Sequence, residues 1–249
     1  MRWAVSKALA KAWAERQASV AEHVINGDPP VTVHIRQSGR ARRISLRVSR
    51  LDGKVTLTHP NSVSERAALD FAYERADWLR GHVSDVPGLV PVEIGASLMI
   101  EGAVLRVTAG TGRRVTVSDG LMQVPGPQSQ VGRKAASFLK TLARERLAAA
   151  SDHYAAKLGK SFQRISLRDT RSRWGSCSTR GTLMYSWRLI MAPPDVLRYV
   201  AAHEVAHLAE MNHSKAYWEG LYQIHGPYEA PRKWLRDHGG QLHRFQFTP

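Results

Sequence analysis

Short stretches of alternating apolar and polar residues in the first half of the chain predict β-strands. The strings VTVHI and ISLRV, within residues 31–58, repeat with the period of two that places apolar side chains on one face of a sheet. Asp52 and Gly53 predict a hairpin turn between the second string and VTLT. Ser62, with Glu65 three residues later, has the spacing of a capping box, so we expect a helix to begin at Ser62.

Longer periodic segments in the second half predict helices. The pattern is helical from about residue 130 to 159, and Pro193 with Pro194 predicts the start of a further apolar helix. Two shorter helices are expected near 215–224 and 229–238. Between the first helix and the prolines, the strings QRISLRD and TLMYSWRLIMA predict two strands, joined by the loop TRSRWGSCSTRG.

These elements predict an α+β protein. We expect an N-terminal extension at residues 1–28, a β-rich region with one helix at 29–128, and an α+β domain at 129–249. The extension is basic and alanine-rich and does not have the compact apolar core of a secretory signal. No internal repeat is evident in the sequence.

Composition limits the classes of protein to which the chain can belong. Apolar residues make up 43% of the 249 residues, which is enough for a core, yet no run approaches the ~20 apolar residues of a membrane span. The single cysteine, Cys177, excludes an intramolecular disulfide and fits a reducing compartment. We therefore expect a cytoplasmic protein without a membrane span.

The chain carries a formal charge of +15, which favours binding of anions such as nucleic acid or nucleotides. Arginines gather in the string RQSGRARRISLRVSR at residues 36–50. Because part of this string alternates like a strand, it is either a solvated basic face or an anion-binding surface. Charge alone does not choose between the two.

The string HEVAHLAEMNHS, residues 203–214, contains the main candidate site. His203 and His207 lie four residues apart in an apolar helix, so both rings can face one ion. Burying such polar rings without partners would cost about 2–7 kcal/mol, and a metal ion removes that cost. Glu204 is placed to reach a water on that ion, which is the arrangement His-Glu-x-x-His found in zinc hydrolases.

A third ligand is needed, and His213 is the first candidate. In a continuous helix His213 would lie about 15 Å along the axis from His203, so the helix must end first. Asn212 tolerates the left-handed conformation that ends helices, and we expect the end between Ala209 and Asn212. The alternative third ligand is a carboxylate downstream, Glu219. Three nitrogen ligands and an open position favour Zn²⁺ in a catalytic site.

The strings SRWGSCS, WRLIMAPPDVLRYVAAHEVAHLAEMNHSKAYW and RKWLRDHG resemble the YgjP-like metallopeptidase family, a relative of the SprT-like peptidases. The resemblance covers roughly residues 30–242. It implies a zincin-like catalytic domain of the α+β class, with His203, His207 and His213 as zinc ligands and Glu204 as general base. Tyr217 stands where the family tends to have phenylalanine, which concerns packing more than chemistry.

Several residues near the motif are candidates for binding substrate. Arg171, Arg173 and Arg188 can hold a carboxylate or phosphate or stabilise an oxyanion, or they can simply pair with local acids. The string LMYSWRLI, which contains Tyr185, is a candidate edge strand for pairing with an extended substrate, although an ordinary inner strand has the same pattern. We select Arg173, Arg188 and Tyr185 as substrate-binding residues.

Three functions remain open. The first is a zinc-dependent, metallopeptidase-like hydrolase that acts on a protein or peptide. The second is a metal-dependent nucleoside triphosphate pyrophosphatase or phosphohydrolase, an activity also attached to some members of the family that the chain resembles. The third is a protease module whose basic surface binds nucleic acid, although no nucleic-acid-binding motif is visible.

Overall fold

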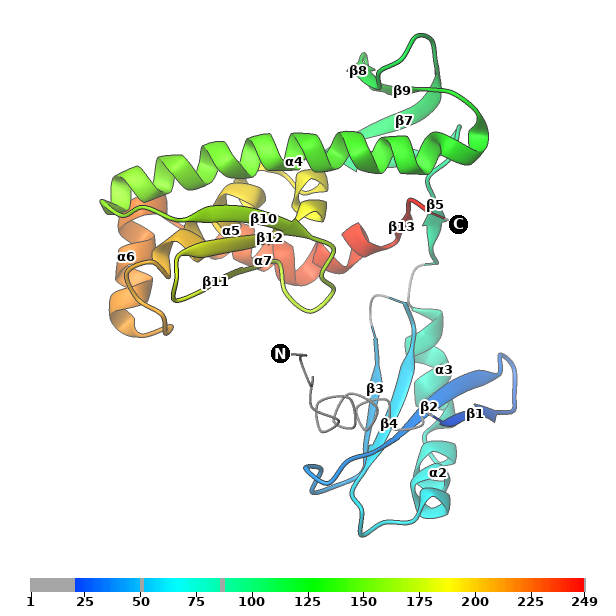
Figure 1. The fold of residues 1–249 in the computed structure, drawn as a ribbon. Helices are drawn as coiled ribbons and strands as arrows, with labels where there is room; N and C mark the ends of the chain where they lie inside the picture. The colour runs from blue at the N-terminus through cyan, green and yellow to red at the C-terminus, as the bar shows by residue number, and fades with distance from the viewer. Residues whose placement is uncertain (1–20, 50–51, 86–87, 249) are drawn as a thin grey trace, which may run out of the picture. The chain divides into compact units, whose positions relative to one another are not determined.

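The computed structural model describes residues 21–49, 52–85 and 88–248. It divides into two compact units, one ending at Gly88 and one comprising Leu89–Pro249 (Figure 1). The boundary expected near residue 128 falls inside the second unit, at the start of its longest helix. Residues 1–20 of the expected extension lie outside the described residues, whereas Ala21–Ile25 form the first strand of the first sheet.

The first unit is a four-stranded sheet with two helices. The strand order is β1-β2-β4-β3, and the central pair, β2 and β4, is parallel. Leu57 and Leu79 are fully buried where the helices pack on the sheet. The elements are β1 (Ala21–Ile25), β2 (Val31–Gln37), β3 (Ser45–Val48), β4 (Val55–His59), α2 (Glu65–Tyr73) and α3 (Ala76–Ser84).

The structure corrects the expected start of the helix in this unit. Ser64, not Ser62, is the N-cap, and its hydroxyl accepts a hydrogen bond from the backbone N–H of Ala67. Ser62 belongs to the preceding turn, in which the N–H of Val63 donates to the carbonyl of Pro60. The side chain of the buried His59 also bonds the Val63 carbonyl, so the turn is fixed independently of the helix.

A second four-stranded sheet opens the other unit and repeats the topology of the first. Its order is β6-β7-β9-β8, with antiparallel outer pairs and a parallel central pair, as in the first sheet. Tight turns lie at Glu101 and Asp119, and both residues have positive φ angles, 49° and 51°. The strands of this sheet are β6 (Ser97–Ile100), β7 (Ala103–Gly110), β8 (Thr116–Ser118) and β9 (Leu121–Pro125). The short strand β5 (Val90–Pro91) precedes them and lies outside the sheet.

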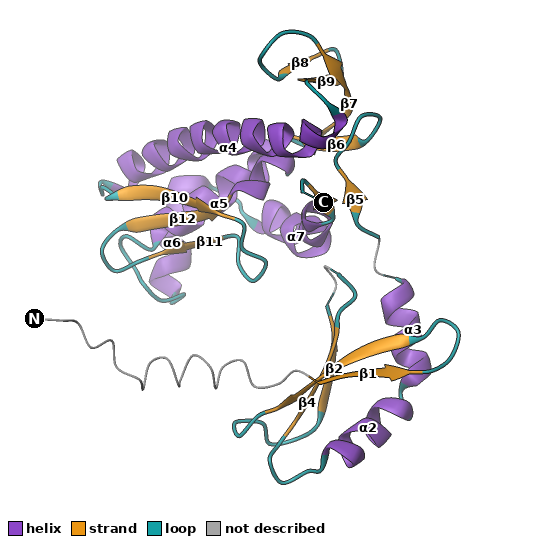
Figure 2. Ribbon diagram, turned by 45° about the vertical axis from the view of Figure 1, so that its right-hand side comes forward, coloured by secondary structure: helices purple, strands orange, loops and turns teal. Residues whose placement is uncertain are grey.

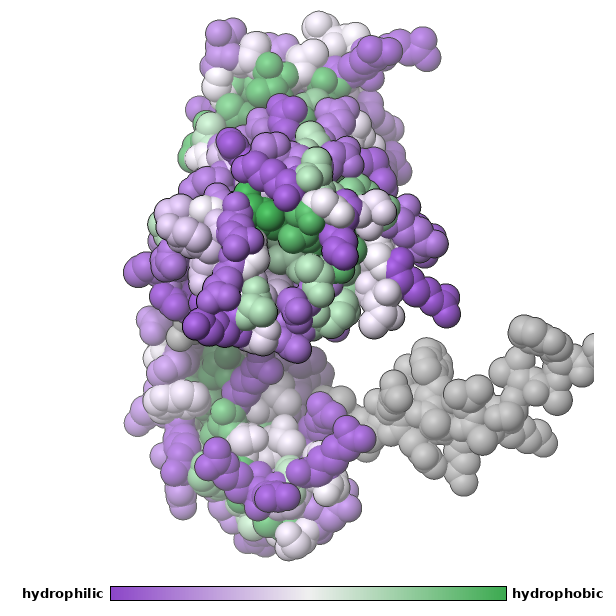
Figure 3. Space-filling model, turned by 90° about the vertical axis from the view of Figure 1, so that its left-hand side faces the viewer, coloured by the Kyte–Doolittle hydropathy of each residue, from purple (hydrophilic) through white to green (hydrophobic). Residues whose placement is uncertain are grey.

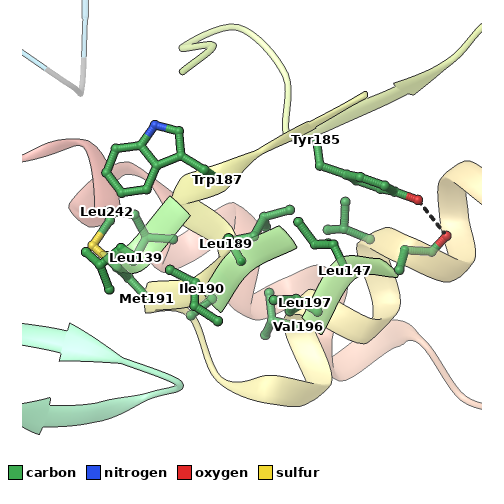
Figure 4. Close-up of a cluster of buried hydrophobic side chains, with 14 of the residues drawn as sticks. Leu139, Leu147, Tyr185, Trp187, Leu189, Ile190, Met191, Val196, Leu197 and Leu242 are labelled. Atoms are coloured by element: carbon green, nitrogen blue, oxygen red, sulfur yellow. Dashed lines mark hydrogen bonds between the residues drawn. The ribbon is translucent and has the colours of Figure 1, made fainter. Parts of the chain in front are cut away.

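Helix α4 (Gln128–Leu158) is 31 residues long and ends at Gly159, whose φ of 65° is the left-handed conformation typical of a helix C-terminus. A stripe of buried residues follows one face of the helix at helical spacing. The stripe packs against α5 (Pro194–Ala206) and against the 3₁₀ helix η2 (Trp187–Met191), and this contact forms much of the core shown in Figure 4.

A three-stranded sheet lies beside these helices (Figure 2). It consists of β10 (Arg164–Arg168), β12 (Thr182–Ser186) and β11 (Gly175–Cys177), with β12 in the middle. The strand expected over TLMYSWRLIMA stops at Ser186, and its second half forms η2. A continuous apolar run does not distinguish a buried strand from a buried helix, which explains the error.

Three helices complete the second unit. Helix α5 begins at Pro194, as expected, and is followed by α6 (Lys215–His225) and α7 (Glu229–His238). The chain then passes through η3 (Gly239–His243) to β13 (Phe245–Gln246), which pairs with β5. Helices and sheets thus combine as the α+β class predicts. Within the described residues, no helix is both long and apolar enough to span a membrane.

Candidate metal centre

Helix α5 presents the first part of the candidate site. It is mostly apolar, and nine of its thirteen residues are buried. His203 and His207 lie one turn apart on it, with ring centroids 5.2 Å from each other. His207 is 9% exposed and the intervening Glu204 only 5%, so the site is built on a helix face that packs against the protein interior.

The chain turns sharply after α5, which brings His213 back to the helix. Regular helix ends at Ala206, earlier than expected, and a tight turn continues to Glu210, whose N–H donates to the carbonyl of Ala206. The left-handed conformation expected at Asn212 is absent. The Asn212 side chain instead accepts the N–H of Ser214, 2.9 Å away, and Ser214 caps α6.

The three histidines converge as a metal site requires. Each offers a nitrogen, and the three nitrogens lie within 4.8 Å of one another. The Nε2 atoms of His203 and His213 are 3.2 Å apart. Two nitrogens bound tetrahedrally to one zinc ion, each about 2.0–2.1 Å from it, would be roughly 3.4 Å apart. The separation therefore fits zinc closely.

The protonation of the rings also fits a cation. Burial, followed by the charges of His207, His213 and Arg232, lowers the pKa of His203 to about 3. Burial, His207 and Arg232 lower the pKa of His213 as well. Rings that remain neutral keep the lone pairs that a metal needs. The Nδ1 of His203 is buried without a hydrogen-bond partner among the described residues, and Nε2 is the His203 nitrogen that points to His213.

Two contacts orient these rings. The Nδ1 of His207 lies 2.9 Å from the carbonyl oxygen of Glu210, which leaves Nε2 for the metal. Tyr217 stacks on His207 with a centroid distance of 4.6 Å, and its hydroxyl donates to the carbonyl oxygen of His203 at 2.9 Å. Tyr217, which stands where the family tends to have phenylalanine, was expected to affect packing more than chemistry. Its hydroxyl also links α6 to α5 through the hydrogen bond to His203.

Glu219, the alternative third ligand, does not join the cluster. It lies on α6 and forms an ion pair with Lys215 at 3.6 Å. Among the described residues, the potential metal-binding group at this place consists of His203, His207 and His213.

Glu204 is held against strand β11. A Cβ atom added to Gly175 would lie only 2.5 Å from the Glu204 Oε1 atom, so the glycine leaves the space that the carboxylate occupies. Burial raises the pKa of Glu204 to about 8, and the positive charge of Arg173 opposes that rise. Of the predicted substrate-binding residues, Arg173 is the one whose charge acts on Glu204, and its side chain is exposed.

The other two predicted substrate-binding residues have structural contacts. Arg188 is 9% exposed, and its guanidinium donates to both carboxylate oxygens of Asp169 and to the carbonyls of Leu242 and Phe245. Tyr185 is fully buried and its hydroxyl bonds Ser151 (Figure 4). Neither side chain is accessible to a substrate, so their predicted role does not fit the structure.

The strand containing Tyr185 is likewise not the predicted edge strand. In the three-stranded sheet β12 is the inner strand, and β11 and β10 are the edges. Strand β11 also carries Cys177, which is half-buried. Burial, with the charge of Glu204, raises the pKa of this thiol to about 11, which disfavours the reactive thiolate form.

An α+β fold with a helix-borne histidine triad and an adjacent buried glutamate is typical of metal-dependent hydrolases. The family model described as the YgjP-like metallopeptidase domain matches residues 42–238, and the chain belongs to this family. It is therefore a metallopeptidase-type hydrolase, and membership of the family implies a metal cofactor and a protein or peptide substrate.

A crystal structure of the metallopeptidase zymogen abylysin of Pyrococcus abyssi is a distant structural match. The match covers 37% of this chain and 95% of that chain, at 17% identity and a TM-score of 0.34, which is too weak to carry an argument. No curated protein matches the chain.

Proposed function

We propose that the chain is a zinc-dependent metallopeptidase in which Glu204 is the general base. The observation that carries the proposal is the convergence of nitrogens from three histidines beside one buried carboxylate. A zinc ion held by His203, His207 and His213 would act as a Lewis acid that polarises the scissile carbonyl and lowers the pKa of water. The remaining chemistry is assigned to side chains of the protein.

Glu204 accepts a proton from the attacking water and delivers it to the leaving amine. Its burial and its contact with β11 restrict it to few positions. Strand β11 is the edge of its sheet next to Glu204, so an extended peptide that pairs with this edge would bring its carbonyl towards the site. Arg173, near the same carboxylate, is placed to stabilise the negative charge that develops on the peptide oxygen.

The test compares the zinc-loaded protein with its Glu204→Gln variant on unfolded protein and on a panel of nucleoside triphosphates. Glu219→Gln is the matched control, because Glu219 is exposed and pairs only with Lys215 in the described structure. We expect Glu204→Gln to retain one zinc ion and to lose peptide hydrolysis by about 10²–10⁴-fold, the usual contribution of a general base. Full activity in this variant would remove Glu204 from the mechanism.

The same experiment addresses the two alternatives. Release of phosphate or pyrophosphate that depends on Glu204, without peptide cleavage, would establish the phosphohydrolase in place of the peptidase. Nucleic-acid binding that weakens steeply with salt and is unaffected by Glu204→Gln would support the third function. The family match supports neither alternative, and both remain predictions.

A further inference from the structure

An aromatic and cationic group borders the histidine triad and has no part in holding the metal. Trp218, on α6, lies 5.6 Å from His213 and 6.1 Å from His203, measured between ring centroids. Tyr228 also stacks on Trp218, with ring centroids 5.2 Å apart. The guanidinium of Arg232, on α7, lies 4.8 Å from the centre of the Trp218 ring. Arg232 is thus one aromatic ring away from two proposed ligands.

The charge of Arg232 is not neutralised within the protein. Among the described residues no carboxylate forms an ion pair with it, and its side chain is exposed. The nearest acid on its own helix, Glu229, accepts the backbone N–H of Tyr228 instead. The charge of Arg232 also helps to lower the pKa values of His203 and His213, which agrees with its position beside them.

An unpaired cation beside a site for a divalent cation is electrostatically unfavourable for the free enzyme. Arg173 adds a second positive charge on the side of Glu204. With zinc bound, the formal charges of zinc, Arg173, Arg232 and ionised Glu204 would sum to +3. An anionic group brought by the substrate would offset part of this excess.

We propose that Arg232, oriented by stacking on Trp218, is a specificity-determining residue that binds a carboxylate of the substrate. The planar guanidinium can bind a carboxylate through two parallel hydrogen bonds, and stacking on an indole reduces its freedom to move. The enzyme then prefers peptides with an acidic side chain close to the scissile bond. This inference rests on the proposed peptidase function.

The test uses a peptide that the wild-type enzyme cleaves, synthesised in pairs that differ only by glutamate or glutamine at each position flanking the scissile bond. Zinc-loaded wild type, Arg232→Gln and Arg232→Lys are compared. Arg236→Gln is the matched control, because Arg236 lies one turn further along α7 and already bonds Asp237. Binding of the same peptides to the zinc-loaded Glu204→Gln variant, with and without Arg232→Gln, provides a second measurement that does not depend on turnover.

We expect the wild type to prefer the acidic peptide by about tenfold or more in kcat/KM, mainly through KM, as for loss of a hydrogen bond to a charged group. Arg232→Gln should abolish the preference for the acidic peptide, Arg232→Lys should retain part of it, and Arg236→Gln should retain all of it. The zinc content should stay at one ion in every variant.

Different outcomes refute different claims. Equal cleavage of acidic and neutral peptides by the wild type, or an unchanged preference in Arg232→Gln, refutes the role of Arg232 and leaves the peptidase intact. If no peptide is cleaved, the proposed function itself is wrong and this inference is wrong with it. If Arg232→Gln weakens only the binding of inorganic phosphate or of nucleoside triphosphates, the anion that Arg232 binds is a phosphate and not a carboxylate.

Discussion

Replacement of Gly175 by alanine tests whether strand β11 positions the proposed general base. The backbone of Gly175 lies outside the left-handed region, so alanine introduces no backbone strain. In a strand the substitution would ordinarily stabilise the protein by roughly 0.5–1 kcal/mol, since glycine loses more freedom on folding. Here the contact with Glu204 opposes that gain.

The magnitude of the contact follows from three distances. The new Cβ would lie 2.5 Å from Oε1, 2.6 Å from Cγ and 2.8 Å from Cδ of Glu204. Carbon atoms prefer a separation of about 3.5–4.0 Å, so the carboxylate or the strand must move by roughly 1 Å. Overpacking of this kind costs about 1–3 kcal/mol, and a displacement of 1 Å at a catalytic group can reduce the rate about 100-fold.

The assay measures kcat, zinc content and urea-induced unfolding for Gly175→Ala and for a control, Gly220→Ala. Gly220 lies in α6 with nothing within 4 Å of its added Cβ, so its substitution should stabilise the protein by up to about 1 kcal/mol and leave activity unchanged. Gly175→Ala should retain zinc and lose most of its turnover. Wild-type kcat in Gly175→Ala would refute the claim that β11 positions Glu204.

The remaining predictions concern the buried group that holds the C-terminal segment. Burial and the charge of Arg188 lower the pKa of His243 to about 4, against an attraction from Asp169. An unfolded chain, with a histidine pKa of 6.5, binds more protons between pH 6.5 and 4, so stability must fall as the pH falls through this window. When the pH is lowered from 7 to 5, the unfolding free energy of His243→Gln should fall by about 2 kcal/mol less than that of the wild type. An unchanged pH dependence of stability in urea titrations would contradict this. Arg188→Met should cost about 3 kcal/mol, because it leaves Asp169 and two carbonyls without their donor; a loss below about 1 kcal/mol would show that these bonds contribute little.

The net charge of the protein follows directly from its counts of acidic and basic residues. The chain carries a formal charge of +15, and on the face drawn in Figure 3 hydrophilic residues cover most of the area while hydrophobic residues form smaller patches. This charge favours anionic ligands in general. A basic residue can select a ligand only if its charge is not already paired within the fold. Arg188 is paired with Asp169, whereas Arg232 lies against Trp218.

Local features of the chain were predictable because they depend on neighbours in sequence. The four-residue spacing of His203 and His207 places both rings on one helix face in any helical conformation. The start of α5 at Pro194 and the turns at Glu101 and Asp119 follow from local backbone preferences. Errors arose where two local structures suit the same residues, as in the apolar run that becomes η2.

The sequence by itself thus determined the α+β class, most elements of the second unit and the pair of histidines on α5. Only the tertiary structure decided that His213 lies beside His203 and His207, that β12 is an inner strand, and that Arg188 is buried whereas Arg232 lies against Trp218. The physical reason is that these outcomes depend on the direction of a turn and on packing between segments distant in sequence. The hydrophobic periodicity and the residue types specify neither the direction of that turn nor the packing between distant segments.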